Sequence, residues 1–61
     1  MDIKVYYIEN SLALTDALNQ IRDDFPVFID REFIEQDYSQ VAINAREEDF
    51  PAIEDILAPL M

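Results

Sequence analysis

Carboxylates are the side chains of this sequence that are numerous enough to suggest chemistry. The 61 residues include fourteen Asp and Glu against four Lys and Arg, which gives a net charge of −10. Most of the excess lies between residues 23 and 55, where eleven acids accompany only Arg31 and Arg46. The acids that we take as candidates for partner binding are Asp30, Glu32, Glu35, Asp37, Glu47, Glu48, Glu54 and Asp55.

Catalysis by these acids would need one specific pair. Two carboxylates can act as general acid and general base when one lies in an apolar pocket that raises its pKa. Any two of the fourteen acids would fit that description, and so short a chain has little room for a substrate pocket of a few hundred Å³. The sequence has no His and no Cys, which excludes the usual nucleophilic triads. We therefore expect a protein that is not an enzyme.

Metal and cofactor sites are equally poorly supported. The spacings Asp30-x-Glu32 and Glu35-x-Asp37 offer oxygen ligands for hard cations such as calcium, but they do not follow the EF-hand pattern. The absence of His and Cys excludes the common zinc and iron ligand sets. The absence of Gly excludes the glycine-rich loops that bind phosphate. We expect no dedicated metal site and no cofactor.

Mimicry of nucleic acid is the reading that uses the acids best. If residues 30–37 are extended, Asp30 with Glu32 and Glu35 with Asp37 each place two carboxylates on one face, about 6.6–6.8 Å apart. A DNA strand advances about 3.4 Å per phosphate, so the carboxylates would match every second phosphate. Held rigidly, they could pair with Arg and Lys that otherwise bind phosphate. The alternative is that the acids form a solvated surface that only favours solubility.

The tyrosines are the candidates for interface anchors, because Tyr buries a large area and keeps a polar tip. Residues 2–8 alternate as in a strand. If Ile3, Val5 and Tyr7 face the helices, Tyr6 lies on the open side of the sheet, where we expect it to be partly buried at the sheet edge. Tyr38 is a further anchor. The phenylalanines are interpreted as core residues: Phe25, Phe28, Phe33 and Phe50.

A first helix is predicted after the opening strand. Asn10 and Ser11 offer an N-cap, and Pro26 ends the helix. Apolar residues follow at helical spacing at Leu14, Ala17, Leu18, Ile21 and Phe25.

The middle of the chain is predicted to be a hairpin. Residues 27–34 fit a strand with a bulge near residues 32–34, with a helical turn over 31–38 as the alternative. Residues 37–40 are interpreted as the turn and residues 41–45 as the second strand.

A last helix is predicted over residues 47–60, with Pro51 in its first turn. Its buried stripe would be Phe50, Ile53, Leu57 and Leu60.

These elements predict one small acidic domain over residues 1–61, of class α+β. The order is β-α-β-β-α, with a three-stranded sheet and two helices packed on one face. A domain of this size buries only about 60% of its surface on folding, so it often depends on a disulfide, a metal or a partner subunit. Without Cys or His, a homodimer or a bound protein is the remaining option.

The charge also restricts partners and location. A surface this acidic repels nucleic acid and anionic membranes, so we expect no direct binding to either. No apolar run approaches the roughly 20 residues that span a bilayer, and the N-terminus lacks the pattern of a signal peptide. We expect a location in the cytoplasm of a bacterial cell or of a phage-infected host.

Five short motifs lie at residues 1–5, 23–26, 41–45, 48–49 and 53–57. Together they resemble the DinI family, small acidic proteins of bacteria and phages that modulate the RecA recombinase filament. The resemblance implies that the acidic face of the last helix occupies the DNA-binding region of the recombinase, a role that would fall to Glu47, Glu48, Glu54 and Asp55. The chain departs from the family at Asn44, where the family has Gly, and at Glu47 and Glu48, where it has lysines. The family also has a longer acidic C-terminal helix, whereas the sequence here stops at Met61, soon after Pro59.

Two hypotheses of function follow. The first is a non-enzymatic inhibitor or modulator that binds a nucleic-acid-binding protein through a DNA-mimicking carboxylate surface. Its target would be a recombinase or a phage-defence nuclease such as a CRISPR effector, the latter an anti-defence role. The second is a structural or regulatory module that docks or dimerises through an apolar sheet face.

Overall fold

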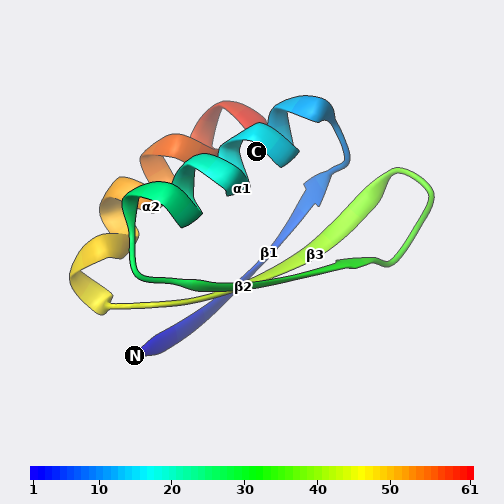
Figure 1. Ribbon diagram of the computed structural model, residues 1–61. Coiled ribbons are helices and arrows are strands. Elements are labelled where there is room, and N and C mark those ends of the chain that lie inside the picture. Colours follow the sequence, from blue (N-terminus) through cyan, green and yellow to red (C-terminus); the bar gives the residue numbers. More distant parts are fainter.

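The computed structural model describes all residues from 1 to 61 and has the predicted β-α-β-β-α order (Figure 1). One-turn 3-10 helices precede and follow the last α-helix, at Glu47–Asp49 and Ala58–Leu60. The other elements are β1 (Asp2–Glu9), α1 (Leu12–Asp24), β2 (Phe28–Phe33), β3 (Tyr38–Ala45) and α2 (Phe50–Leu57).

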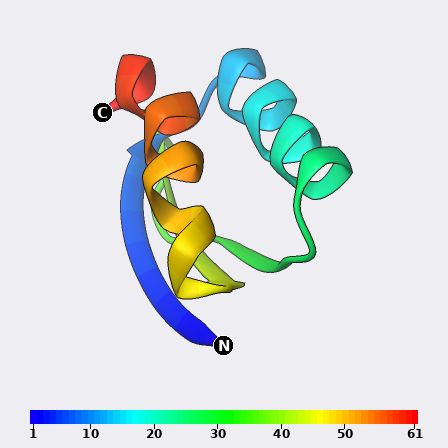
Figure 2. The same ribbon diagram turned by 90° about the vertical axis from the view of Figure 1, so that its left-hand side faces the viewer.

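The sheet has β3 at its centre. β3 pairs antiparallel with β1 on one side and with β2 on the other, so the order is β1-β3-β2 and both β1 and β2 are edge strands. Both helices lie over the same face, α2 above β1 and α1 above β2 (Figure 2). The predicted architecture is confirmed, and one face of the sheet is left without a helix.

The core lies between the helices and the covered face of the sheet. Along β3 every second residue, from Ser39 to Ala45, is buried against the helices. The helical stripes predicted from the sequence supply most of the rest of the core: Leu14, Ala17, Leu18, Ile21, Phe50, Ile53 and Leu57. Phe25, Ile56 and Leu60 are half-buried at its margin.

Local sequence signals explain where the helices begin and end. The Ser11 side chain caps α1, because its Oγ accepts a hydrogen bond from the Leu14 amide at 3.0 Å. The extended backbone of Phe25, before Pro26, ends the helix as predicted. Pro51 lies in the first turn of α2, where its missing N–H leaves no helical bond unmade. No helix is both long enough and apolar enough to cross a membrane.

The orientation of β1 differs from the expected one. Tyr6 pairs with Val41 and Ile8 with Ser39, so the even-numbered residues of β1 face the helices. Ile8 is 1% exposed, whereas Ile3 on the opposite face is 64% exposed. Apolar residues stand at both parities of this strand, so alternation alone could not select the inner face. The arrangement considered from the sequence, in which Ile3, Val5 and Tyr7 would face the helices, is therefore not the one that the structure has.

The hairpin is also simpler than expected. Residues 28–33 form a strand and not the alternative helix, and their pairing with β3 runs without a bulge. The connection is residues 34–37, and β3 starts at Tyr38, within the stretch that was predicted to be the turn. No residue of the chain has a positive φ. Because the two-residue hairpin turns need positive φ and favour Gly, a chain without Gly makes the longer connection instead.

Candidate functional site: the open face of the sheet

The face of the sheet without a helix, here called the open face, carries alternate residues of all three strands. The register places them in three rows: Ile3, Asn44 and Phe28; Val5, Ala42 and Asp30; Tyr7, Gln40 and Glu32. Tyr38 and Glu9 form a further pair at the hairpin end. The open face is therefore built from residues of all three paired strands.

One side of the open face is apolar. Val5 is 48% exposed and Tyr7 65%, on the same strand as the exposed Ile3, whereas Phe28, 74% exposed, lies on β2 at the opposite edge. Ile3, Val5 and Tyr7 follow one another along β1, and we call them the apolar lane. Single exposed apolar residues are normal on a protein surface, but a contiguous set on one face indicates an interaction site.

The opposite side of the open face is acidic. Asp30 and Glu32 lie on β2 and share the open face, about 6.8 Å apart along the strand. The strand therefore places these two acids on one face, as the prediction for this pair assumed. Neither carboxylate forms an ion pair: the three ion pairs of the structure involve only Lys4 and Arg46 with acids of the last helical segment. We call Asp30 and Glu32 the carboxylate lane.

The remaining acidic candidates do not join this surface. Glu35 and Asp37 lie in the hairpin connection and are not extended, so their predicted strand-like spacing was wrong. Glu47 and Glu48 follow the far end of β3, whose eight residues span about 24 Å. The two remaining candidate acids, Glu54 and Asp55, belong to α2 on the covered side of the sheet. The ten candidate residues are thus distributed over several parts of the molecule.

Tyr6 packs under α2 and not on the open face. Its hydroxyl donates a hydrogen bond to Glu54 Oε2 at 2.7 Å, and Lys4 Nζ lies 3.8 Å from the same oxygen. Burial raises the pKa of Tyr6 above its ordinary value, and the hydrogen bond to Glu54 and the charge of that carboxylate raise it further. Partial burial of Tyr6 at the sheet edge is confirmed, but its placement on the open side was wrong. Tyr6 and Glu54 therefore join β1 to α2.

Two phenylalanines interpreted as core residues are exposed. Phe28 lies on the open face, and Phe33 is 68% exposed near the hairpin connection, where the Arg31 guanidinium lies 4.7 Å from the centre of its ring. Both residues belong to an edge strand that the helices cover only in part (Figure 2). Of the four phenylalanines, only Phe50 is fully buried.

Arg31 forms a network that the sequence did not reveal. Its guanidinium donates hydrogen bonds to Ser39 Oγ at 3.1 Å, Thr15 Oγ1 at 2.9 Å and Asn10 Oδ1 at 3.1 Å. Ser39 also donates to Asn10. The network connects β2, β3 and the start of α1, and it contains no carboxylate. The alternation along β2 could have indicated it, because Arg31 lies two residues after Ile29 and therefore shares the face of the strand that points toward the helices.

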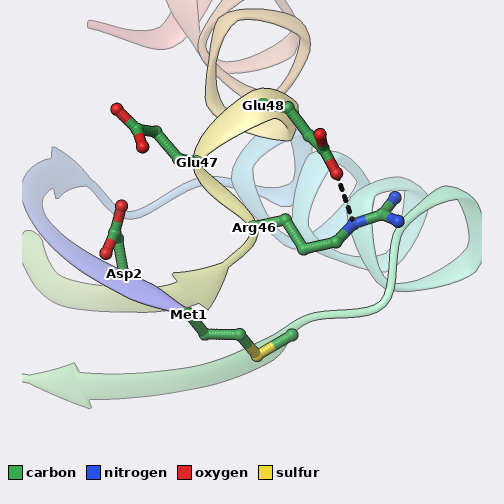
Figure 3. A pocket seen from close by; sticks show the side chains of 5 residues that line it. All are labelled: Met1, Asp2, Arg46, Glu47 and Glu48. Atoms are coloured by element: carbon green, nitrogen blue, oxygen red, sulfur yellow. Dashed lines mark ion pairs between the residues drawn. The ribbon is translucent and has the colours of Figure 1, made fainter.

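A surface depression lies where the chain enters the last helical segment. It is lined by Met1, Asp2, Arg46, Glu47 and Glu48 (Figure 3). Arg46 Nε lies 3.6 Å from Glu48 Oε1 and 2.8 Å from Asp49 Oδ2, so the base is already paired. In Figure 3 the Arg46 side chain points toward Glu48 and away from Asp2 and Glu47. The depression contains no pairing of a nucleophile with a base.

The structure contains no cluster of side chains that could bind a metal ion. Nowhere in the structure do three or more Asp, Glu, His or Cys side chains gather closely enough to hold an ion. The open face therefore remains the surface with the clearest chemical character.

No family model, no curated protein and no solved structure matches the chain. The resemblance to the DinI family accordingly stays a prediction, and the function has to be argued from the geometry.

Proposed function

We propose that the protein is a non-enzymatic binding module that docks a protein partner through the open face. The observation that carries this proposal is that one face of the sheet presents an exposed apolar lane on β1 and an unpaired carboxylate lane on β2, with only β3 between them. A partner that fits both has an apolar patch beside exposed Arg or Lys side chains. The two lanes supply different parts of the binding energy.

The apolar lane supplies affinity. Burying apolar surface stabilises a complex by about 25 cal/mol per Å² before the cost of association is subtracted. Tyr is among the residues that most often dominate an interface, because it combines a large apolar area with a hydroxyl. Tyr7, 65% exposed on the edge strand β1, is the residue best placed for this role.

The carboxylate lane supplies selectivity and speed. A net charge of −10 attracts basic proteins over long range and accelerates their encounter. The spacing of Asp30 and Glu32 corresponds to every second phosphate of a DNA strand, so arginines that normally hold phosphates fit it. This argument favours a nucleic-acid-binding protein, such as a recombinase or a phage-defence nuclease, as the target that the module inhibits or modulates.

The last helix is a weaker candidate for the same role. Glu48 is paired with Arg46 and Glu54 with Lys4 and Tyr6, so their charges are partly neutralised within the molecule. Glu47 and Asp55, like Asp30 and Glu32, have no such partners, but only Asp30 and Glu32 share the open face with the apolar lane. The proposed contact set is therefore the open face and not the acidic helix that the DinI resemblance implied.

A capture experiment with matched variants tests the proposal. The wild-type chain is used to capture partners from bacterial lysate at ~50 mM salt. Each captured protein is then purified, and its affinity for the wild type and for the variants is measured. Asp30→Lys with Glu32→Lys should weaken binding at least tenfold, and added DNA should displace the protein. Asp16→Lys with Asp23→Lys is the control, because it makes the same charge change on the exposed side of α1.

Salt gives a second readout on the same purified pair. Binding should weaken steeply between ~50 and ~200 mM salt, because screening removes the attraction between exposed charges. A partner that binds both double variants equally well, with no response to DNA, would show that the open face is not the docking surface.

A further inference from the structure

The two edges of the sheet differ in how they are protected. β2 has charges at three of its six positions, namely Asp30, Arg31 and Glu32, and Pro26 precedes it. Charges and proline at an edge are the usual means by which proteins prevent a further strand from pairing. The outer edge of β2 is therefore blocked.

β1 has little of this protection along its middle. It is eight residues long, pairs with β3 without a bulge and contains no proline. Between its terminal acids, Asp2 and Glu9, Lys4 is the only charged residue. Its outer edge therefore presents unpaired backbone groups along an apolar strand, which is a template for another strand.

We propose that this strand pairs with β1 of a second copy of the chain, antiparallel about a two-fold axis between the two Val5 residues. The pairing makes one six-stranded sheet from two protomers. Two-fold symmetry brings the same surface of each protomer together, and both open faces then lie on the same side. Because both open faces lie on the same side, residues that lie opposite each other must come from the same face of the strand, and this restricts the possible registers.

Within that condition, the side chains select the register centred on Val5. It places Ile3 opposite Tyr7 of the second copy on the open face, an aromatic and β-branched pair of the kind that stabilises sheets. Centring on Lys4 would set two lysines opposite each other, and centring on Tyr6 would set Ile3 opposite Glu9. In the proposed register both terminal acids fall at the ends of the ladder.

The covered side of the sheet is complementary in charge. Lys4 comes to lie opposite Tyr6 of the second copy, whose hydroxyl is bonded to Glu54. Each lysine thereby approaches the carboxylate of the other protomer as well as its own, which lies at 3.8 Å. A small domain with an eleven-residue core gains in this way the partner subunit that such domains often need.

The dimer joins the two apolar lanes at the centre of one sheet, with a carboxylate lane on each outer side. Two chains of charge −10 repel each other, so salt should favour the dimer by screening. This dependence is opposite to the one expected for a basic partner. The dimer and the proposed function are therefore tested separately.

Sedimentation of the full chain at ~50 and ~500 mM salt tests the dimer. The mass should rise with concentration from the 7.1 kDa of one chain to twice that value, at lower concentration in high salt. Val5→Glu places two carboxylates at the two-fold axis and should weaken the dimer at least tenfold. Phe28→Glu makes the same charge change at an exposed apolar residue of the other edge and should leave the dimer unchanged.

Cross-linking keeps the test decisive if Val5→Glu fails to fold. The chain has no cysteine, so Val5→Cys introduces a single thiol at the axis, where opposite Cα atoms about 4.5–5.5 Å apart lie within disulfide range. Mild oxidation should convert Val5→Cys to a disulfide dimer much faster than Phe28→Cys. A wild-type chain that stays monomeric at millimolar concentration in both salts, or equal cross-linking of the two cysteine variants, would overturn the proposal.

Discussion

The hydrogen bond between Tyr6 and Glu54 is the residue-scale contact with the clearest pH dependence. The pKa of Tyr6 is raised by burial and then by Glu54, whereas an unfolded tyrosine loses its proton near pH 10. The stabilisation is therefore complete below about pH 10 and is lost as the pH rises toward the higher pKa of the folded state. Tyr6→Phe should lower the free energy of unfolding by about 1–2 kcal/mol at neutral pH.

The pH profile distinguishes this contact from simple packing. The difference between wild type and Tyr6→Phe, measured by urea unfolding, should shrink as the pH increases above 10. If the difference in the free energy of unfolding stayed constant from pH 8 to pH 11, the hydrogen bond donated by the Tyr6 hydroxyl would not contribute to stability.

Arg31 provides a second prediction at this scale. Arg31→Met removes three hydrogen bonds and leaves the polar atoms of Asn10 and Ser39 without their charged partner. Hydrogen bonds to a charged group contribute about 1.5–3 kcal/mol, so a loss of that size is expected in urea unfolding. The control is Arg22→Met, which removes the same charge from an exposed arginine with a single 3.4 Å bond to Asn19. If both variants lost the same free energy of unfolding, the change in net charge, and not the loss of the hydrogen bonds, would explain the effect of Arg31→Met.

At the scale of elements, the orientation of β1 decides which residues form the open face. Ile8→Ala should cost about 2–5 kcal/mol, because it opens a cavity in the core, whereas Ile3→Ala should change stability by no more than about 0.5 kcal/mol. Chemical denaturation at micromolar concentration provides the comparison. A larger loss of stability for Ile3→Ala than for Ile8→Ala would indicate that the odd-numbered residues of β1 face the helices.

The sequence predicted the elements better than their faces. The spacing of Leu14, Ala17, Leu18 and Ile21 left one interpretation for α1, because only one side of that helix is apolar. In β1 both sides are apolar, and the inner one depends on Ile8 reaching the core, which only the pairing with β3 establishes. Carboxylates on separate elements, such as Glu35 and Glu48, could not be placed relative to one another before the topology was known.

At the scale of the whole molecule, the charge of −10 is spread over the sheet, the hairpin connection and both helices, and the open face combines part of it with the exposed Ile3, Val5 and Tyr7. Self-repulsion of this size opposes the compact state, and salt screens it. The midpoint of thermal unfolding should therefore rise between ~20 and ~500 mM salt at neutral pH, when followed by circular dichroism. A falling midpoint would indicate that the ion pairs of Lys4 and Arg46 outweigh the repulsion.

Side-chain NMR of the chain, titrated with a partner purified by the capture experiment, tests the central claim most directly. The account predicts that the resonances of Ile3, Val5, Tyr7 and Phe28 shift or broaden on binding. The resonances of Leu12 and Met61, which are exposed apolar residues away from the open face, should stay unchanged. Shifts at Leu12 and Met61 with no change on the open face would contradict the account.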